Sequence, residues 1–267
     1  MQLNDSNFIK DQKTGIYMPH SSACQDTNIK IYRDGELSYE GRNKVIVSGA
    51  GFTAHKHFPL ATSEITPSYN ASLSLEQTVA TDTTKPQYVY LFAVGTDGCG
   101  TEASQVYPVD YKKRINPTAL VPFRYPLTSA DISASLRTTY FGRKTIGDRI
   151  AYYFKAFDTA PVFKQQFDDG TDIDANIFSD STAREVVSYV ELKLKVSKDD
   201  CREYFVATTG INNAKINSIS LLTAWANTGT DGYTYYQDIR PLTCLHFSNQ
   251  SLIDLTAGLD IVYQVYY

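Results

Sequence analysis

Two histidines, His55 and His57, are spaced so that both could bind one metal ion. On a strand, residues at positions i and i+2 lie on the same face, so both imidazoles would be available to one metal ion. A stable site needs further ligands, and the chain contains 4 histidines in all, with no third ligand near this pair in the sequence. We therefore predict a surface pair and no metal site.

The densest group of carboxylates lies at residues 168–174, with aspartates at 168, 169, 172 and 174. An EF-hand loop would need a glutamate at its twelfth position and a helix on each side, and the sequence provides neither. A looser calcium loop is an open alternative, because carboxylates this close together repel one another without a cation. The favoured interpretation is a solvated turn.

No recognised motif for nucleophilic catalysis occurs in the sequence. The chain contains no Gly-x-Ser-x-Gly elbow, no His-Glu-x-x-His pair and no Walker phosphate loop. Cys201 and His246 would be the members of a cysteine–histidine pair, but a single Cys and a single His are more often structural. A carboxylate pair for glycoside hydrolysis would come from distant strands and has no local signature. We predict no enzyme activity, no catalytic residue and no cofactor.

The composition favours a β protein that makes extensive contacts. Of 267 residues, 20 are Tyr and 13 are Phe, and tyrosine suits half-exposed strands and subunit interfaces. The formal net charge of −4 and the lack of a long basic cluster argue against a nucleic-acid partner. No apolar stretch is long enough to cross a bilayer, so no membrane partner is expected. The first residues lack a signal-peptide pattern, and the 4 widely spaced cysteines are expected to be reduced thiols of a protein made in a cytoplasm.

Alternating or continuous apolar runs predict the strands that would position the polar side chains. A hairpin is expected around Asp34-Gly35, because this dipeptide favours the tight turn between two strands. One short helix is expected at residues 127–137, where capping residues precede apolar residues four apart. Strands are predicted at residues 29–32, 37–39, 87–94, 150–157, 161–167, 186–196, 203–208, 216–225, 233–236 and 259–267.

These elements predict an all-β protein, mainly an antiparallel sandwich, with one or two short helices and an extended N-terminal arm. We divide the chain into an N-terminal arm with a short hairpin, residues 1–42, and a β-sandwich domain, residues 43–267. The sandwich domain contains a long insertion around residues 116–185, and prolines at 108, 117, 122 and 126 punctuate the region where it begins. The C-terminal strand is expected to complete the sheet.

Four separated segments, in the same order along the chain, resemble segments of a group of tailed-bacteriophage virion proteins. They are residues 43–49 (NKVIVSG) followed by Phe52, residues 90–98 (YLFAVGTDG), residues 216–224 (INSISLLTA), and residues 251–255 together with residues 261–267. Ser218 and Ser220 depart from the pattern, which has an acidic residue and a glycine there, and residues 116–196 form a longer segment than the pattern leads us to expect. The resemblance implies a β-sandwich that assembles into a particle, and it carries over no catalytic residue.

On this resemblance we expect a structural component of a tailed-phage virion, in the neck or collar, the tail or the baseplate. Its partners would be other copies of itself in a ring and adjacent phage structural proteins, and its location would be the virion, after synthesis in the host cytoplasm. The residues expected at these interfaces are tyrosines of the arm and of a turn-rich loop: Tyr17, Tyr32, Tyr233, Tyr235 and Tyr236.

Two alternatives belong to other functional classes. The chain could be a glycan-binding module of a tail fibre or tailspike, in which exposed tyrosines and Trp225 stack on sugar rings. It could also be a β-rich hydrolase or lyase that uses carboxylates such as Asp168 and Asp172.

Overall fold

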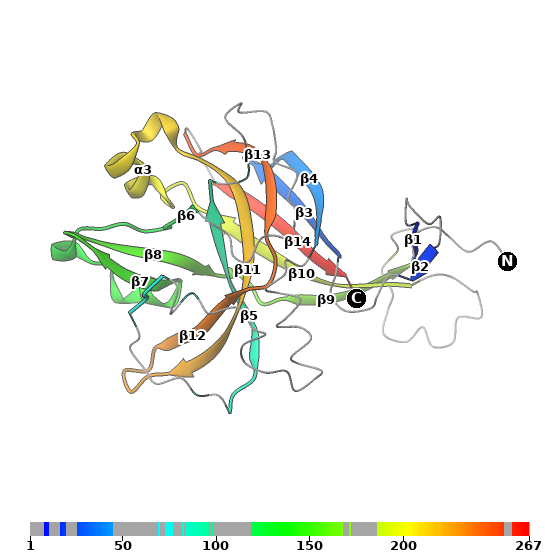
Figure 1. Cartoon of the computed structure of the whole chain (residues 1–267), viewed down its shortest axis with the longest axis horizontal. Helices are drawn as coiled ribbons and strands as arrows, with labels where there is room; N and C mark the ends of the chain where they lie inside the picture. Colours follow the sequence, from blue (N-terminus) through cyan, green and yellow to red (C-terminus); the bar gives the residue numbers. More distant parts are fainter. Residues whose placement is uncertain are drawn as a thin grey trace.

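A computed structural model of the chain describes residues 8–10, 17–19, 26–44, 69, 73–76, 82, 84–96, 98, 119–167, 171, 186–253 and 258–266. Its strands form two large sheets, and all of their strand pairs are antiparallel (Figure 1). The predicted all-β, mainly antiparallel fold class is therefore confirmed. A separate two-stranded sheet pairs β1 (Phe8–Lys10) with β2 (Tyr17–Pro19).

The first large sheet has five strands in the order β4-β3-β14-β10-β9. The predicted hairpin is present and is part of this sheet, because β3 pairs with both β4 and β14; its turn places Asp34 and Gly35 at positive φ (48° and 88°), as a tight hairpin turn requires. The C-terminal strand lies in the middle of the sheet. The strands are β3 (Asp26–Arg33), β4 (Glu36–Lys44), β9 (Val162–Phe167), β10 (Val186–Val196) and β14 (Leu259–Tyr266).

The second sheet has seven strands, five of them in the order β12-β11-β5-β8-β7. The long strand β11 pairs with β5 along one side, whereas its other side pairs first with β13 and then with β12. Short β6 pairs with the end of β5. The strands are β5 (Gln87–Gly95), β6 (Leu120–Val121), β7 (Tyr140–Ile146), β8 (Arg149–Ala156), β11 (Lys215–Thr228), β12 (Thr234–Pro241) and β13 (Leu245–Ser251).

The main hydrophobic core lies between the two sheets, where Ile31 of β3, Leu194 of β10 and Leu221 of β11 belong to one buried cluster. A second buried cluster includes Leu91 of β5, Phe154 of β8 and Leu222 of β11. Successive residues of β5 therefore enter different clusters, which explains its continuous apolar sequence. Both faces of the seven-stranded sheet bury apolar side chains, and this burial is the main source of stability.

Two elements differ from the prediction. Residues 127–137 do not form an α-helix but two 3-10 turns, Thr128–Ala130 and Ala134–Thr138, because the backbone at Asp131 and Ser133 is extended. Residues 203–208 form helix α3 (Arg202–Thr208) instead of a strand; it buries Phe205 and leaves Val206 60% exposed. Within the described ranges, no helix has the length and apolar character needed to span a bilayer.

Glycine is required at one position of β7. Gly142 has φ +70°, and a Cβ there would lie 2.6 Å from Cε2 of the Phe154 ring. We expect Gly142→Ala to lower the free energy of unfolding by about 2–4 kcal/mol, measured by urea denaturation, because left-handed strain adds to overpacking. Gly147→Ala is the matched control: its φ is +62° with open space around the Cβ, so about 1 kcal/mol is expected. Equal losses at the two positions would contradict the packing argument.

Candidate functional site

Most of the polar residues singled out from the sequence lie outside the described residues: His55, His57, Asp168 and Asp172. Cys201 and His246 are described, and both are buried. Burial raises the pKa of the Cys201 thiol well above its ordinary value, so this cysteine does not supply a thiolate nucleophile. Where residues are described, no group of three or more His, Cys, Asp or Glu side chains is arranged to hold a metal ion.

The described residues form a groove of about 290 Å³ where the edge strands β7 and β12 of the seven-stranded sheet approach each other. We name it the aromatic groove, because tyrosine and phenylalanine make up much of its wall. Its charged members come from β7, from the 3-10 region before β7, and from Glu76. The lining residues are Glu76, Asp131, Arg137, Tyr140, Phe141, Gly142, Arg143, Tyr152, Tyr233, Thr234, Tyr235, Tyr236 and Gln237.

Two tyrosines of β12 have different roles in this wall. Tyr236 is partly buried and packs against the second hydrophobic cluster, with its ring centroid 4.6 Å from that of Phe141 and 5.1 Å from that of Tyr90. Tyr235 is held by the turn before β12: its hydroxyl donates to Asp231 (2.5 Å), and a Cβ on Gly229 would lie 2.7 Å from its ring. The Tyr235 ring is therefore fixed over the hairpin backbone before any ligand arrives.

A chain of charged and polar side chains forms the other wall. Arg143 makes ion pairs with both Glu76 and Asp131, and Asp131 also accepts a hydrogen bond from the Tyr152 hydroxyl (2.7 Å). Glu76 binds the backbone of β7 as well: its N–H donates to the Arg143 carbonyl, and its carboxylate accepts from the N–H of Thr145. Guanidinium and carboxylate groups are thus positioned beside aromatic rings.

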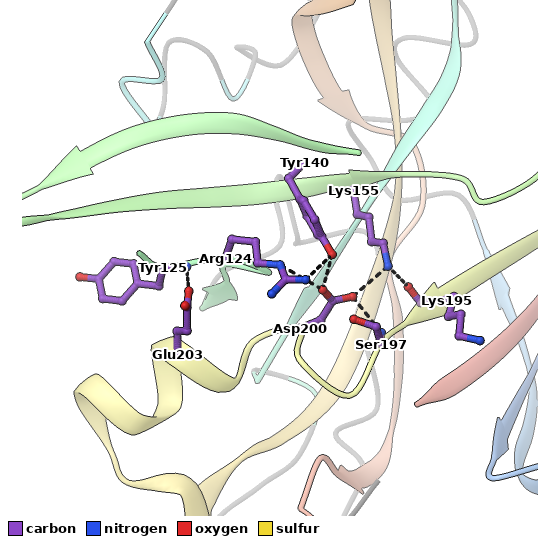
Figure 2. Close-up of polar contacts among 8 residues, drawn as sticks. All are labelled: Arg124, Tyr125, Tyr140, Lys155, Lys195, Ser197, Asp200 and Glu203. Atoms are coloured by element: carbon purple, nitrogen blue, oxygen red, sulfur yellow. Dashed lines mark hydrogen bonds and ion pairs between the residues drawn. The ribbon is translucent and has the colours of Figure 1, made fainter. Parts of the chain in front are cut away.

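A second polar cluster lies in the interior and centres on Asp200 (Figure 2). Asp200, whose side chain is fully buried, accepts hydrogen bonds from Lys155 (2.9 Å), from the Tyr140 hydroxyl (2.6 Å) and from the N–H of Ser197 (2.8 Å). Arg124 donates to the Tyr140 hydroxyl (3.0 Å) and lies 3.6 Å from the Asp200 carboxylate. Burial and the Asp200 charge raise the pKa of Tyr140, so the phenol stays protonated as a donor.

Lys155 makes this cluster a link between the two sheets. It belongs to β8 of the seven-stranded sheet, and it also donates to the carbonyl of Lys195 in β10 of the five-stranded sheet (2.7 Å). Lys155, Tyr140 and Asp200 are hydrogen-bonded to one another or to the backbone, and Arg124 bonds Tyr140 while its Nε has only the ion pair with Asp200. None of these side chains except Tyr140 lines the aromatic groove. We therefore assign the cluster a structural role.

The tyrosines expected at subunit interfaces are divided among three places. Tyr233, Tyr235 and Tyr236 come together in the aromatic groove. Tyr32 lies in β3 of the other sheet, and Tyr17 in β2, where the structure describes only the backbone. The charged lining residues Glu76, Asp131, Arg137 and Arg143 were not singled out from the sequence, because no spacing connects positions so far apart.

Comparisons with protein-family models, with curated proteins and with solved structures find no match to this chain.

The residues that line the aromatic groove determine what it could bind. Aromatic faces bind apolar or planar surfaces, and guanidinium and carboxylate groups bind hydroxyl groups or charged partners.

Removing the buried charge of Asp200 should lower the free energy of unfolding strongly. In Asp200→Asn, Lys155 and Arg124 lose the carboxylate that offsets their charges in the interior, so we expect a loss of about 3–5 kcal/mol in the free energy of unfolding, measured by urea denaturation. Asp260→Asn is the control, because its ion pair with Lys195 joins side chains that are 53% and 41% exposed, and a loss of at most about 1 kcal/mol is expected. A loss at Asp200 as small as that at Asp260 would show that the cluster does not hold the fold together.

The stabilisation that Tyr152 contributes should be lost at alkaline pH. Burial, followed by its contact with Asp131, raises the pKa of Tyr152 to about 12 from the ordinary value of 10.0. The unfolded chain therefore releases this proton first, so the stabilisation is complete below pH 10.0 and is lost as the pH rises toward about 12. We expect the stability difference between wild type and Tyr152→Phe, measured by urea denaturation, to shrink across this interval. A difference that does not change with pH would contradict the assignment.

Proposed function

We propose that the protein is a structural component of a tailed-phage virion, in the neck or collar, the tail or the baseplate, and that it acts by subunit–subunit contacts. The observation that carries this proposal is a two-stranded ribbon at the edge of the five-stranded sheet. β10 pairs with β9 from Val186 to Glu191 but with β14 only from Tyr189 onward, so the ribbon continues beyond the rest of the sheet. In Figure 1, β9 and β10 run outward from the sandwich along its long axis.

On its outer side, β9 has no strand partner among the described residues. In the described part of the chain, β9 pairs with β10 alone, and Val162 at its start is 49% exposed. A two-stranded ribbon without a core is marginally stable by itself, and an open edge offers backbone donors and acceptors to another chain. An edge that pairs with a different surface of the next copy makes a head-to-tail contact, which closes into a ring when the rotation allows. The expected partners are therefore copies of this chain and adjacent virion proteins.

The segments that resemble phage virion proteins support the proposal by their location. Residues 90–98 begin in β5 and residues 216–224 lie in β11, and these two strands are neighbours, paired from Ser218–Gly95 to Trp225–Gln87. Of the closing segment, residues 261–266 lie in β14, at the centre of the opposite sheet, and residue 251 ends β13; residues 254–255 and 267 lie outside the described residues. Segments far apart in the sequence thus form the core of one sandwich. Of the first segment, the structure describes residues 43–44, at the end of β4.

A charged substitution on the outer edge of β9 tests whether this edge holds the copies together. We expect the purified protein to form oligomers in sedimentation velocity, and Val162→Lys to weaken their association at least tenfold, because a lysine on an edge strand opposes pairing with another strand. Val206→Lys is the matched control: Val206 is 60% exposed on α3, away from this edge, so the oligomers should persist. Both variants should unfold at the wild-type urea concentration.

The presence of the protein in the particle is tested separately by mass spectrometry of purified virions of the phage that encodes the chain. The protein should be present in a fixed number of copies relative to the other structural proteins. Its absence from purified virions would contradict the proposed function. A wild-type chain that stays monomeric, with or without the other virion proteins, would contradict the assembly mechanism.

A further inference from the structure

We propose that the aromatic groove binds a neutral pyranose sugar. Its volume of about 290 Å³ lies at the lower end of the range for small-molecule sites, which suits one or two sugar rings. The lining combines aromatic side chains with hydrogen-bonding groups, the two elements that sugar recognition needs: a flat apolar face for the C–H side of the ring, and polar groups for its hydroxyls. This inference does not depend on the role proposed in the virion.

Tyr235 provides the aromatic platform. Its hydroxyl is held by Asp231, and its ring lies against Gly229, where a larger residue would collide with it. A tyrosine with free rotation would lose conformational entropy on binding a ligand, whereas Tyr235 is already oriented. The short turn at Gly229–Asp231–Tyr233 thus has a function beyond joining β11 to β12.

The charges of the groove favour a neutral ligand. Its charged lining residues are two acids, Glu76 and Asp131, and two bases, Arg137 and Arg143, so the formal charges cancel. Arg143 is already paired with both acids, and an anionic ligand would have to compete with these contacts. Carboxylate oxygens that accept from Arg143 retain lone pairs for sugar hydroxyl groups. A neutral ligand adds hydrogen bonds without breaking the ion pairs.

The same geometry disfavours an added β-strand as the occupant. A strand that pairs with β7 needs consecutive free backbone groups, but Glu76 already binds the carbonyl of Arg143 and the N–H of Thr145. The contact between Phe141 and Tyr236 also crosses from β7 to β12. A compact ligand fits between these obstacles, and an extended peptide does not.

Trp225, which the sequence suggested as a stacking residue, is not part of this site. It lies on β11, where its backbone pairs with Gln87 of β5 and Gln237 of β12, and it does not line the groove. Tyr235 therefore stacks on the sugar ring, and Arg143 and Asp131 bind its hydroxyl groups.

The test uses the full-length protein, labelled on its amines, on an array of neutral mono- and oligosaccharides of glucose, galactose, mannose, rhamnose and N-acetylhexosamines, with sialylated and phosphorylated glycans for comparison. We expect binding to neutral glycans. The best arrayed sugar is then titrated, with saturation-transfer NMR as the readout. Tyr235→Ala should weaken its binding about tenfold or more, as the loss of an aromatic contact predicts. Tyr88→Ala should bind like wild type, because Tyr88 is a 52% exposed tyrosine of the same sheet that does not line the groove.

Tyr235→Phe separates the stacking of the ring from its orientation by the hydroxyl group. It keeps the ring and loses the hydroxyl bond to Asp231, so it should bind more weakly than wild type and more tightly than Tyr235→Ala. The proposal is overturned if no neutral glycan binds, if the charged glycans alone bind, or if Tyr88→Ala weakens binding as much as Tyr235→Ala. An array without signal, combined with loss of oligomers in Tyr235→Ala, would assign the groove to a protein partner instead.

Discussion

The buried carboxylate of Asp200 is the constraint on which the arrangement of the two sheets depends. Moving a charge out of water costs several kcal/mol, and the protein offsets this cost with the Arg124 ion pair and with three hydrogen bonds, from Lys155, Tyr140 and the N–H of Ser197. Because Lys155 also binds the Lys195 carbonyl, the cluster holds β8 against β10 in one register (Figure 2). Apolar packing has no direction, so it can bring two sheets together without fixing their relative position. Tyr140, which begins β7, is bound to the same carboxylate, and this contact positions one wall of the aromatic groove.

Much of the fold could be predicted from local patterns, because half-buried strands repeat every two residues. β10 shows this plainly, with Leu192, Leu194 and Val196 buried on one face. The prediction was wrong where tertiary contacts override local preference. Residues 127–137 have a helical pattern, but Asp131 faces Tyr152 and Arg143, and the backbone extends to make these contacts. Residues 203–208 have a strand-like composition, but the preceding turn, with Cys201 in the left-handed region, directs them into α3.

The candidate site could be predicted only in part. The tyrosines at 233, 235 and 236 attracted attention because they follow a loop of turn residues, and the structure does bring them together. The opposite wall could not be predicted, because Glu76 and Asp131 meet Arg143 through tertiary contacts around β7. That wall faces the tyrosines of β12 only because the edge strands of the seven-stranded sheet approach each other. A sheet's curvature depends on bulges, on glycines such as Gly142 and on cross-strand packing, and none of these has a periodic signature in one sequence.

The edge strands of the two sheets differ in how they are covered, and this difference bears on both the groove and the proposed assembly. An unpaired edge strand invites another strand, so folded proteins cover or block their edges. Here β4 is held against β13 by the hydrogen bond from Ser38 to Gln250, and β7 is blocked by Glu76. β12 faces β7 across the aromatic groove. In the described part of the chain β9 has no such cover, and it lies on the other sheet from the groove. Because β9 and the groove lie on different sheets, a strand added at the β9 edge of one subunit would not by itself occupy that subunit's groove.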